Sequence, residues 1–134
     1  MRNGSVMALK ITLKPKERIV LGGAVIQNGP FKAEFTIENT IPILRQKYIL
    51  SPDDANTPAK RIYFAVQLMY VDEAHLAEHH KLYWQFVREF VSAVPSSLGL
   101  IDQISELILQ GQYYDALKAA RKLIQLEQEV LDRV

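Results

Sequence analysis

Apolar and polar residues alternate along the N-terminal part of the chain. Residues 9–14 and 31–38 alternate strictly, which is typical of β-strands with one buried face. Between them, residues 18–27 ("RIVLGGAVIQ") form an apolar run interrupted by Gly22-Gly23, as a bend, a bulge or a tight turn between two strands would produce. The remaining elements predicted here are a turn at Pro15-Lys16-Glu17, a second turn at Asn28-Gly29-Pro30 and a last strand at residues 41–50.

Beyond this part, apolar residues recur at the spacing of helices. Thr57-Pro58 has the form of a helix start, with a capping side chain followed by proline at the first helical position. Ile62–Val71 is apolar on almost every face, so a buried helix and a central strand both fit it, and its flanking residues favour the helix. The other predicted elements are a short helix start at Ser51-Pro52, an amphipathic helix at residues 73–93, a helix from Ser96 or Ser97 to Gly111, and a last helix at residues 113–131.

These elements define an α+β fold class, with an N-terminal antiparallel β-meander followed by a C-terminal helical bundle. The meander is predicted over residues 8–50 and the bundle over residues 58–132. We expect residues 1–7 to be a disordered tail or an added extension, residues 8–57 to form a β-rich subdomain, and residues 58–134 a helical subdomain.

Composition excludes several functional classes. The chain of 134 residues contains no cysteine, which rules out disulfides, thiolate catalysis and cysteine zinc sites. It has no apolar run long enough for a transmembrane helix, so we expect a cytoplasmic protein without a membrane partner. No phosphate-binding loop, dinucleotide fingerprint or nucleophile elbow is present. We therefore predict neither an enzyme nor a bound cofactor.

One motif carries candidate metal chemistry. His75, Glu78 and His79 form an H-x-x-E-H pattern, in which a helix would place two imidazoles one turn apart beside a carboxylate. A hydrolytic zinc site also needs a third ligand, and none stands out downstream. A solvated helix face that contains histidines is the preferred interpretation, and a zinc hydrolase is a distant alternative.

Positive charge is concentrated in the N-terminal part of the chain. Residues 1–57 hold eight Lys/Arg against five Asp/Glu, whereas residues 94–134 hold four against six. Arg45 and Lys47 are predicted to share one face of the last strand, where they would grip an anionic partner. The full set of predicted RNA contacts is Lys10, Lys14, Lys16, Arg18, Arg45, Lys47, Lys60 and Arg61. A solvated sheet face with protective edge lysines is the alternative.

Three segments together resemble the FlbT family of bacterial flagellar regulators. They are "LKPKERIVLGGAVIQNG" at residues 13–29, "LRQKYIL" at residues 44–50 and "TPAKRIYF" at residues 57–64. Membership implies a post-transcriptional regulator that associates with the 5′ untranslated region of flagellin messenger RNA, mostly as a repressor. It also implies work beside a second small flagellar protein, FlaF, and no catalysis.

A weaker similarity links the predicted meander to the carbon storage regulators of the CsrA family, which bind messenger leaders as dimers. Lys10 and Arg45 lie in places comparable to the basic residues of that family. The first strand departs from the pattern, because Lys10 and Thr12 stand where that family has adjacent arginines. This departure weakens the expectation of base-specific recognition.

Two hypotheses follow for function. In the first, residues 8–57 form an RNA-binding-like subdomain that represses flagellin expression by promoting decay of the messenger or blocking its translation. In the second, the helical half is a chaperone-like module that binds flagellin or FlaF and affects RNA only indirectly. The aromatic segment at residues 82–91 and the acidic C-terminal hairpin favour the second hypothesis. A homo-oligomer is compatible with either one, since Gly22-Gly23 could permit strand exchange.

Overall fold

The computed structural model describes residues 8–133, so the tail expected at residues 1–7 lies outside the described part. The chain divides into two compact units, and the division falls between Ile49 and Leu50. This is earlier than the boundary drawn from the sequence at residues 57 and 58. The backbone of Leu50 exchanges two hydrogen bonds with the side-chain amide of Gln67, at 2.8 and 2.9 Å, which joins the start of the second unit to a helix within it.

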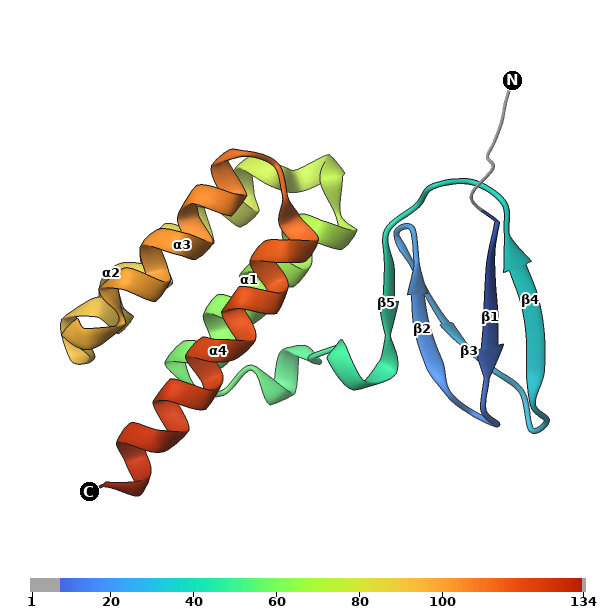
Figure 1. Cartoon of the computed structure of the whole chain (residues 1–134), viewed down its shortest axis with the longest axis horizontal. Helices are drawn as coiled ribbons and strands as arrows, with labels where there is room; N and C mark the ends of the chain where they lie inside the picture. Colours follow the sequence, from blue (N-terminus) through green and yellow to red (C-terminus); the bar gives the residue numbers. More distant parts are fainter. Residues whose placement is uncertain (1–7, 134) are drawn as a thin grey trace. The chain divides into compact units, whose positions relative to one another are not determined.

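Over residues 8–49, the regular structure of the first unit consists of strands and one short 3-10 turn. Its antiparallel strands form two small sheets, β1 with β4 and β2 between β3 and β5 (Figure 1). The strands are β1 (Leu9–Leu13), β2 (Arg18–Leu21), β3 (Ala24–Gln27), β4 (Ala33–Ile37) and β5 (Ile43–Arg45). The predicted α+β class is therefore confirmed. In detail, only β2 and β3 pair as neighbours in sequence, whereas a simple meander would pair every strand with the next.

Alternation of residue type explains how this unit builds its core. Ile11 and Leu13 of β1 are buried and pack with Ile19 and Ile37 from the neighbouring strands. Gly22, with φ of +62°, makes the tight turn between β2 and β3. The glycine pair therefore joins two strands, which was one of the alternatives that the sequence left open.

The last predicted strand is shorter than expected. β5 ends at Arg45, and a 3-10 turn, η1 (Gln46–Tyr48), follows it. The prediction that Arg45 and Lys47 share one strand face is therefore wrong. Alternation within a strand cannot continue through η1, because a 3-10 helix turns its side chains by about 120° per residue.

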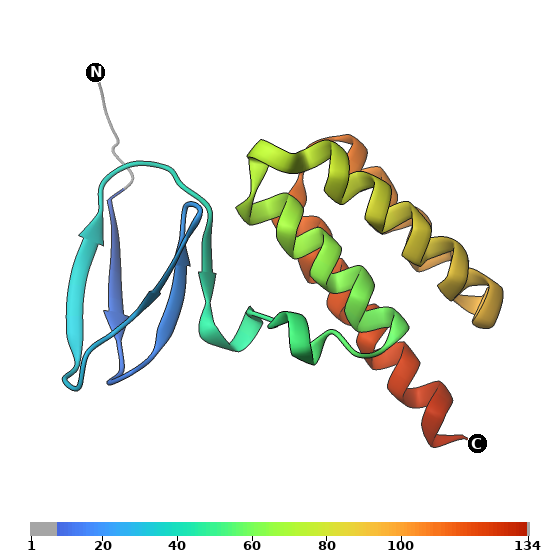
Figure 2. The ribbon, with the colours of Figure 1, turned by 180° about the vertical axis from the view of Figure 1, so that it is seen from behind.

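The second unit is a bundle of four helices. α1 lies against both α2 and α4, and α3 lies against α4 (Figures 1 and 2). The helices are α1 (Pro58–Val71), α2 (Leu76–Ala93), α3 (Leu98–Leu109) and α4 (Tyr113–Asp132). The 3-10 turn η2 (Pro52–Asp54) precedes α1, η3 (Glu73–His75) joins α1 to α2, and η4 (Pro95–Ser97) joins α2 to α3. Ile62, Val66 and Met69 of α1 are fully buried. α1 is therefore the central helix, which explains its apolar residues on almost every face.

Local signals set the start of α1 and the end of α3 as the sequence predicted. The predicted serine cap of α3 was wrong, because Ser97 makes no capping hydrogen bond and its hydroxyl donates to the Val94 carbonyl instead. The Thr57 hydroxyl accepts a hydrogen bond from the backbone N–H of Lys60 at 3.2 Å and so caps α1. After α3, Gly111 has φ of +75°, and the N–H groups of Gly111 and Gln112 donate to carbonyls of the last turn at 3.0 and 2.9 Å. These two bonds form the motif in which glycine commonly ends a helix.

The aromatic stripe of α2 forms part of the core of the helical unit. Tyr83, Val87 and Phe90 are buried, and the Tyr83 hydroxyl forms a hydrogen bond of 2.8 Å with the Ser105 hydroxyl of α3. Burial raises the pKa of Tyr83 to about 12. This stripe was a reason to predict a partner-binding face, and most of it is already occupied within the bundle. Within residues 8–133, no helix is both long and apolar enough to cross a membrane.

Candidate nucleic-acid interface

An open groove of about 890 Å³ lies on the strand unit, where the ends of β1 and β5 meet the segment that leads into β4. Four lysines line it around a single acidic side chain, and we call it the lysine groove. These lysines are Lys14, Lys16, Lys32 and Lys47. All four are exposed, and within the described residues none of them forms an ion pair. Nζ of Lys47 lies over the Tyr48 ring, 5.0 Å from its centroid, a contact that leaves its positive charge unneutralised. The four ammonium groups can therefore attract an anionic ligand.

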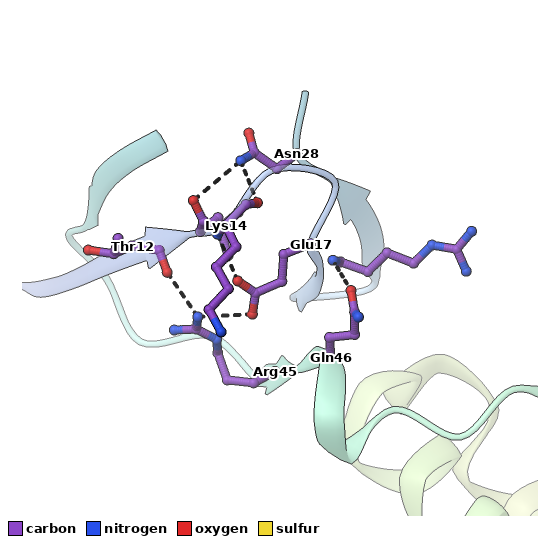
Figure 3. Close-up of polar contacts among 8 residues, drawn as sticks. Thr12, Lys14, Glu17, Asn28, Arg45 and Gln46 are labelled. Carbon is purple, nitrogen blue, oxygen red and sulfur yellow. Dashed lines mark hydrogen bonds and ion pairs between the residues drawn. The ribbon is translucent and has the colours of Figure 1, made fainter. Parts of the chain in front are cut away.

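Arg45 lies in the lysine groove, but its guanidinium already has protein partners. Its Nη2 atom donates to the Thr12 carbonyl at 2.9 Å and to Oε2 of Glu17 at 3.0 Å (Figure 3). The other carboxylate oxygen of Glu17 accepts the backbone N–H of Lys14 at 2.9 Å. Arg45 therefore holds β5 against β1 and the following turn, and in this conformation it acts as a positioning residue.

The acid at the centre of the groove is held in its charged form. The backbone N–H of Lys14, followed by the side chain of Arg45, lowers the pKa of Glu17 below its ordinary value. Only 16% of the Glu17 side chain is exposed, compared with 37% for Arg45. The groove thus contains one internally paired charge couple and four unpaired lysines.

Two turns that carry groove lysines are tied together. The Asn28 side-chain amide donates to the carbonyls of Lys14 at 2.8 Å and Phe31 at 2.9 Å (Figure 3 shows the first of these bonds). The backbone N–H of Lys16 donates to the Gly29 carbonyl at 2.9 Å. The Asn-Gly turn predicted from the sequence therefore also anchors the turn between β1 and β2. These bonds fix the backbone from which the lysine side chains project.

Lys16 has an unusual backbone conformation. Its φ is +65°, in the left-handed region that glycine normally occupies, and it is the only non-glycine residue there within residues 8–133. Lys16 follows Pro15 in a turn that closes with a hydrogen bond of 3.1 Å from the Glu17 N–H to the Lys14 carbonyl. The third position of such a turn favours glycine. Strained residues of this kind concentrate at functional sites.

The structure brings together half of the predicted RNA contacts. Lys14, Lys16, Arg45 and Lys47 line the groove, whereas the side chains of the other four do not. Lys10 lies outside it on β1, 3.8 Å from Glu34, and Arg18 also lies outside. Lys60 and Arg61 belong to the helical unit, in the first turn of α1. Which of these residues contact RNA stays a prediction.

Sequence reasoning missed Lys32. Leu13 pairs with Ala33 at the end of the β1–β4 ladder, so the next residues, Lys14 and Lys32, lie beside each other just beyond the paired segment. Both lysines consequently reach the groove. The alternation at residues 31–38 predicted Lys32 on the polar side of a strand, although β4 begins one residue later, at Ala33. It contained no information that β4 pairs with β1, because that pairing spans the whole β2–β3 hairpin.

The histidine motif forms a hydrogen-bond cluster. Asp72, at the end of α1, accepts from Nδ1 of His75 and from Nε2 of His79, each at 3.0 Å. The hydrogen bond from His79 is the largest cause of the lowered pKa of Asp72. Glu78 is exposed, and no group of three or more potential ligands is placed to hold a metal ion within residues 8–133. The described structure thus lends no support to the zinc alternative.

Together, these features define a small α+β protein with a strand unit that presents a lysine groove and a separate helical unit. The family described as "Flagellar protein FlbT" matches residues 9–131. The chain therefore belongs to the FlbT family, as the resemblance of its three segments indicated. The weaker similarity to the carbon storage regulators stays a prediction.

Several curated relatives cover nearly the whole chain. The "Probable flagellum biosynthesis repressor protein FlbT 1" of Bradyrhizobium diazoefficiens is 49% identical over 92% of this chain and 85% of its own length. The "Probable flagellum biosynthesis repressor protein FlbT" of Rhodopseudomonas palustris is 45% identical, over 95% and 100% respectively. The "Flagellum biosynthesis repressor protein FlbT" of Caulobacter vibrioides is 40% identical, over 96% and 92%. No solved structure matches this chain.

Proposed function

We propose that this protein represses flagellum biosynthesis by binding the leader of flagellin messenger RNA in its lysine groove. The single observation that carries the proposal is the groove itself, with four exposed and unpaired lysines on a backbone held by hydrogen bonds. The printed names of its relatives describe flagellum biosynthesis repressors, which supports the biological direction. RNA as the ligand rests on the chemistry of the groove and on the expectation from the family.

The groove is suited to the phosphates of a nucleic acid. Lysine ammonium groups attract phosphates as point charges, and their release of counterions supplies sequence-independent affinity. Arg45 and Gln46 are groove side chains that could fork to a base, but both have protein partners. Nη2 of Arg45 is bonded to Thr12 and Glu17, and Oε1 of Gln46 accepts the backbone N–H of Arg18. Lys16 brings its charge to the groove from a strained backbone position, and such positions concentrate at functional sites. Bound protein would cover the leader, blocking translation or delivering the messenger to decay.

The test is direct binding of the purified full chain to a flagellin leader RNA. The variant Lys14→Ala plus Lys32→Ala removes two groove cations and should weaken binding strongly. The matched control, Lys81→Ala plus Arg88→Ala, removes the same charge from α2, where both side chains are exposed, and should change binding little. Circular dichroism would establish that both variants are folded.

Two results would overturn the proposal. If the wild-type chain does not bind the leader at low salt, the RNA mechanism fails, and a protein partner of the helical unit becomes the next hypothesis. If both double variants weaken binding equally, the effect belongs to net charge and the groove has no special role.

A further inference from the structure

β3 is an edge strand with an unusual surface. It forms one side of the three-stranded sheet in the order β3-β2-β5, and all four of its residues are exposed. Val25 is 67% exposed and Ile26 is 39% exposed. Two branched apolar side chains on an exposed strand are a feature that folded monomers normally avoid.

The main chain of β3 also faces outward at alternate residues. The Asn28 N–H donates to the Glu17 carbonyl at 2.8 Å, just beyond the pairing of Arg18 with Gln27. Because hydrogen-bonded and non-hydrogen-bonded pairs alternate in antiparallel strands, Val25 and Gln27 turn their main-chain groups away from β2. These groups form a free edge that can accept another antiparallel strand.

β3 differs from the other outer strands of this unit in charge. β1 carries Lys10, β4 carries Glu34 and β5 ends in Arg45, whereas Ala24–Gln27 has no charged residue. Charged side chains are the usual protection of a sheet edge against edge-to-edge pairing, since a twofold axis places like charges opposite each other. A second, identical strand that paired with β3 would therefore bring no like charges together.

We propose that β3 is the docking site for β3 of a second copy of this chain, in an antiparallel pair that joins the two three-stranded sheets. The pair is isologous: with Ile26 on the twofold axis, Val25 of each copy lies opposite Gln27 of the other, and the two Val25 side chains are diagonal neighbours. It satisfies the outward main-chain groups of Val25 and Gln27 and shields the apolar side chains of Val25 and Ile26. The inference goes beyond RNA binding and does not depend on it.

The test is the oligomeric state of the full chain, measured by sedimentation equilibrium. The wild-type chain should be a dimer. Val25→Lys and Val25→Glu should each be monomeric at the same concentration, because each places like charges at the edge. Mixing the two variants should restore a dimer, because opposite charges then meet.

The matched control is Phe31→Lys, which removes a more exposed apolar side chain, 80% exposed, outside β3. This variant should remain a dimer, with circular dichroism confirming that all variants are folded. A monomeric wild type, a dimeric Val25→Lys or a monomeric Phe31→Lys would overturn the proposal. Failure of the two Val25 variants to associate on mixing would overturn it as well.

Discussion

Removing two lysines from the lysine groove should halve the salt dependence of RNA binding. Each phosphate contact contributes about 0.7 to the slope of log affinity against log salt for a single strand. The four lysines of the wild-type groove therefore predict a slope of about 2.8, and Lys14→Ala plus Lys32→Ala leaves about 1.4. Between about 50 and 200 mM salt, affinity should fall about 50-fold for the wild type and about 7-fold for the variant.

Fluorescence anisotropy of a labelled single-stranded leader, titrated at several salt concentrations, measures both slopes. Lys81→Ala plus Arg88→Ala serves as the control and should keep the wild-type slope. A wild-type slope near zero would refute the counterion reasoning, as would an equal decrease in slope for the two double variants. A wild-type slope of about 3.5 would mean that Arg45 leaves Glu17 and also contacts a phosphate.

Three further predictions concern stability. Lys16→Gly should stabilise the protein by up to about 1 kcal/mol in urea unfolding, because it removes left-handed strain, and it should weaken RNA binding by removing a cation. Tyr83→Phe should lower the free energy of unfolding by about 1 kcal/mol, because it leaves the Ser105 hydroxyl without its Tyr83 partner. Adding Ser105→Ala should recover part of this loss, because it removes that hydroxyl. The pKa of Asp72 is lowered, chiefly by the hydrogen bond from His79, so its stabilising contribution is complete above its ordinary pKa and lost as the pH falls through the folded-state pKa. Asp72→Asn should therefore flatten the acid side of the stability profile, and an unchanged profile would contradict this assignment.

Local signals predicted most elements of the fold because their causes are local. Thr57 caps the start of α1 and Gly111 terminates α3, each through hydrogen bonds within about one helical turn, so the nearby sequence contains the whole signal. The end of β5 was misplaced for the opposite reason. Residues 46–50 continue a pattern compatible with a strand, while η1 begins at Gln46, whose side chain accepts the backbone N–H of Arg18 from β2. That contact joins residues far apart in sequence, so the pattern of apolar and polar residues near Gln46 does not reveal it.

The lysine groove was only half predictable. A groove depends on which strands pair, whereas a sequence pattern shows only which face of its own strand a residue occupies. The alternation of apolar and polar residues predicted Lys14 and Lys32 on the polar faces of two strands, but only the β1–β4 register places them at one site. The role of Arg45 depends on pairing as well, since Thr12 and Glu17 reach it from another sheet and another turn. An arginine that looks free in sequence can therefore be the residue that holds a binding surface together. At this site, the cations that can meet phosphate are the four lysines, none of which forms an ion pair within the described residues.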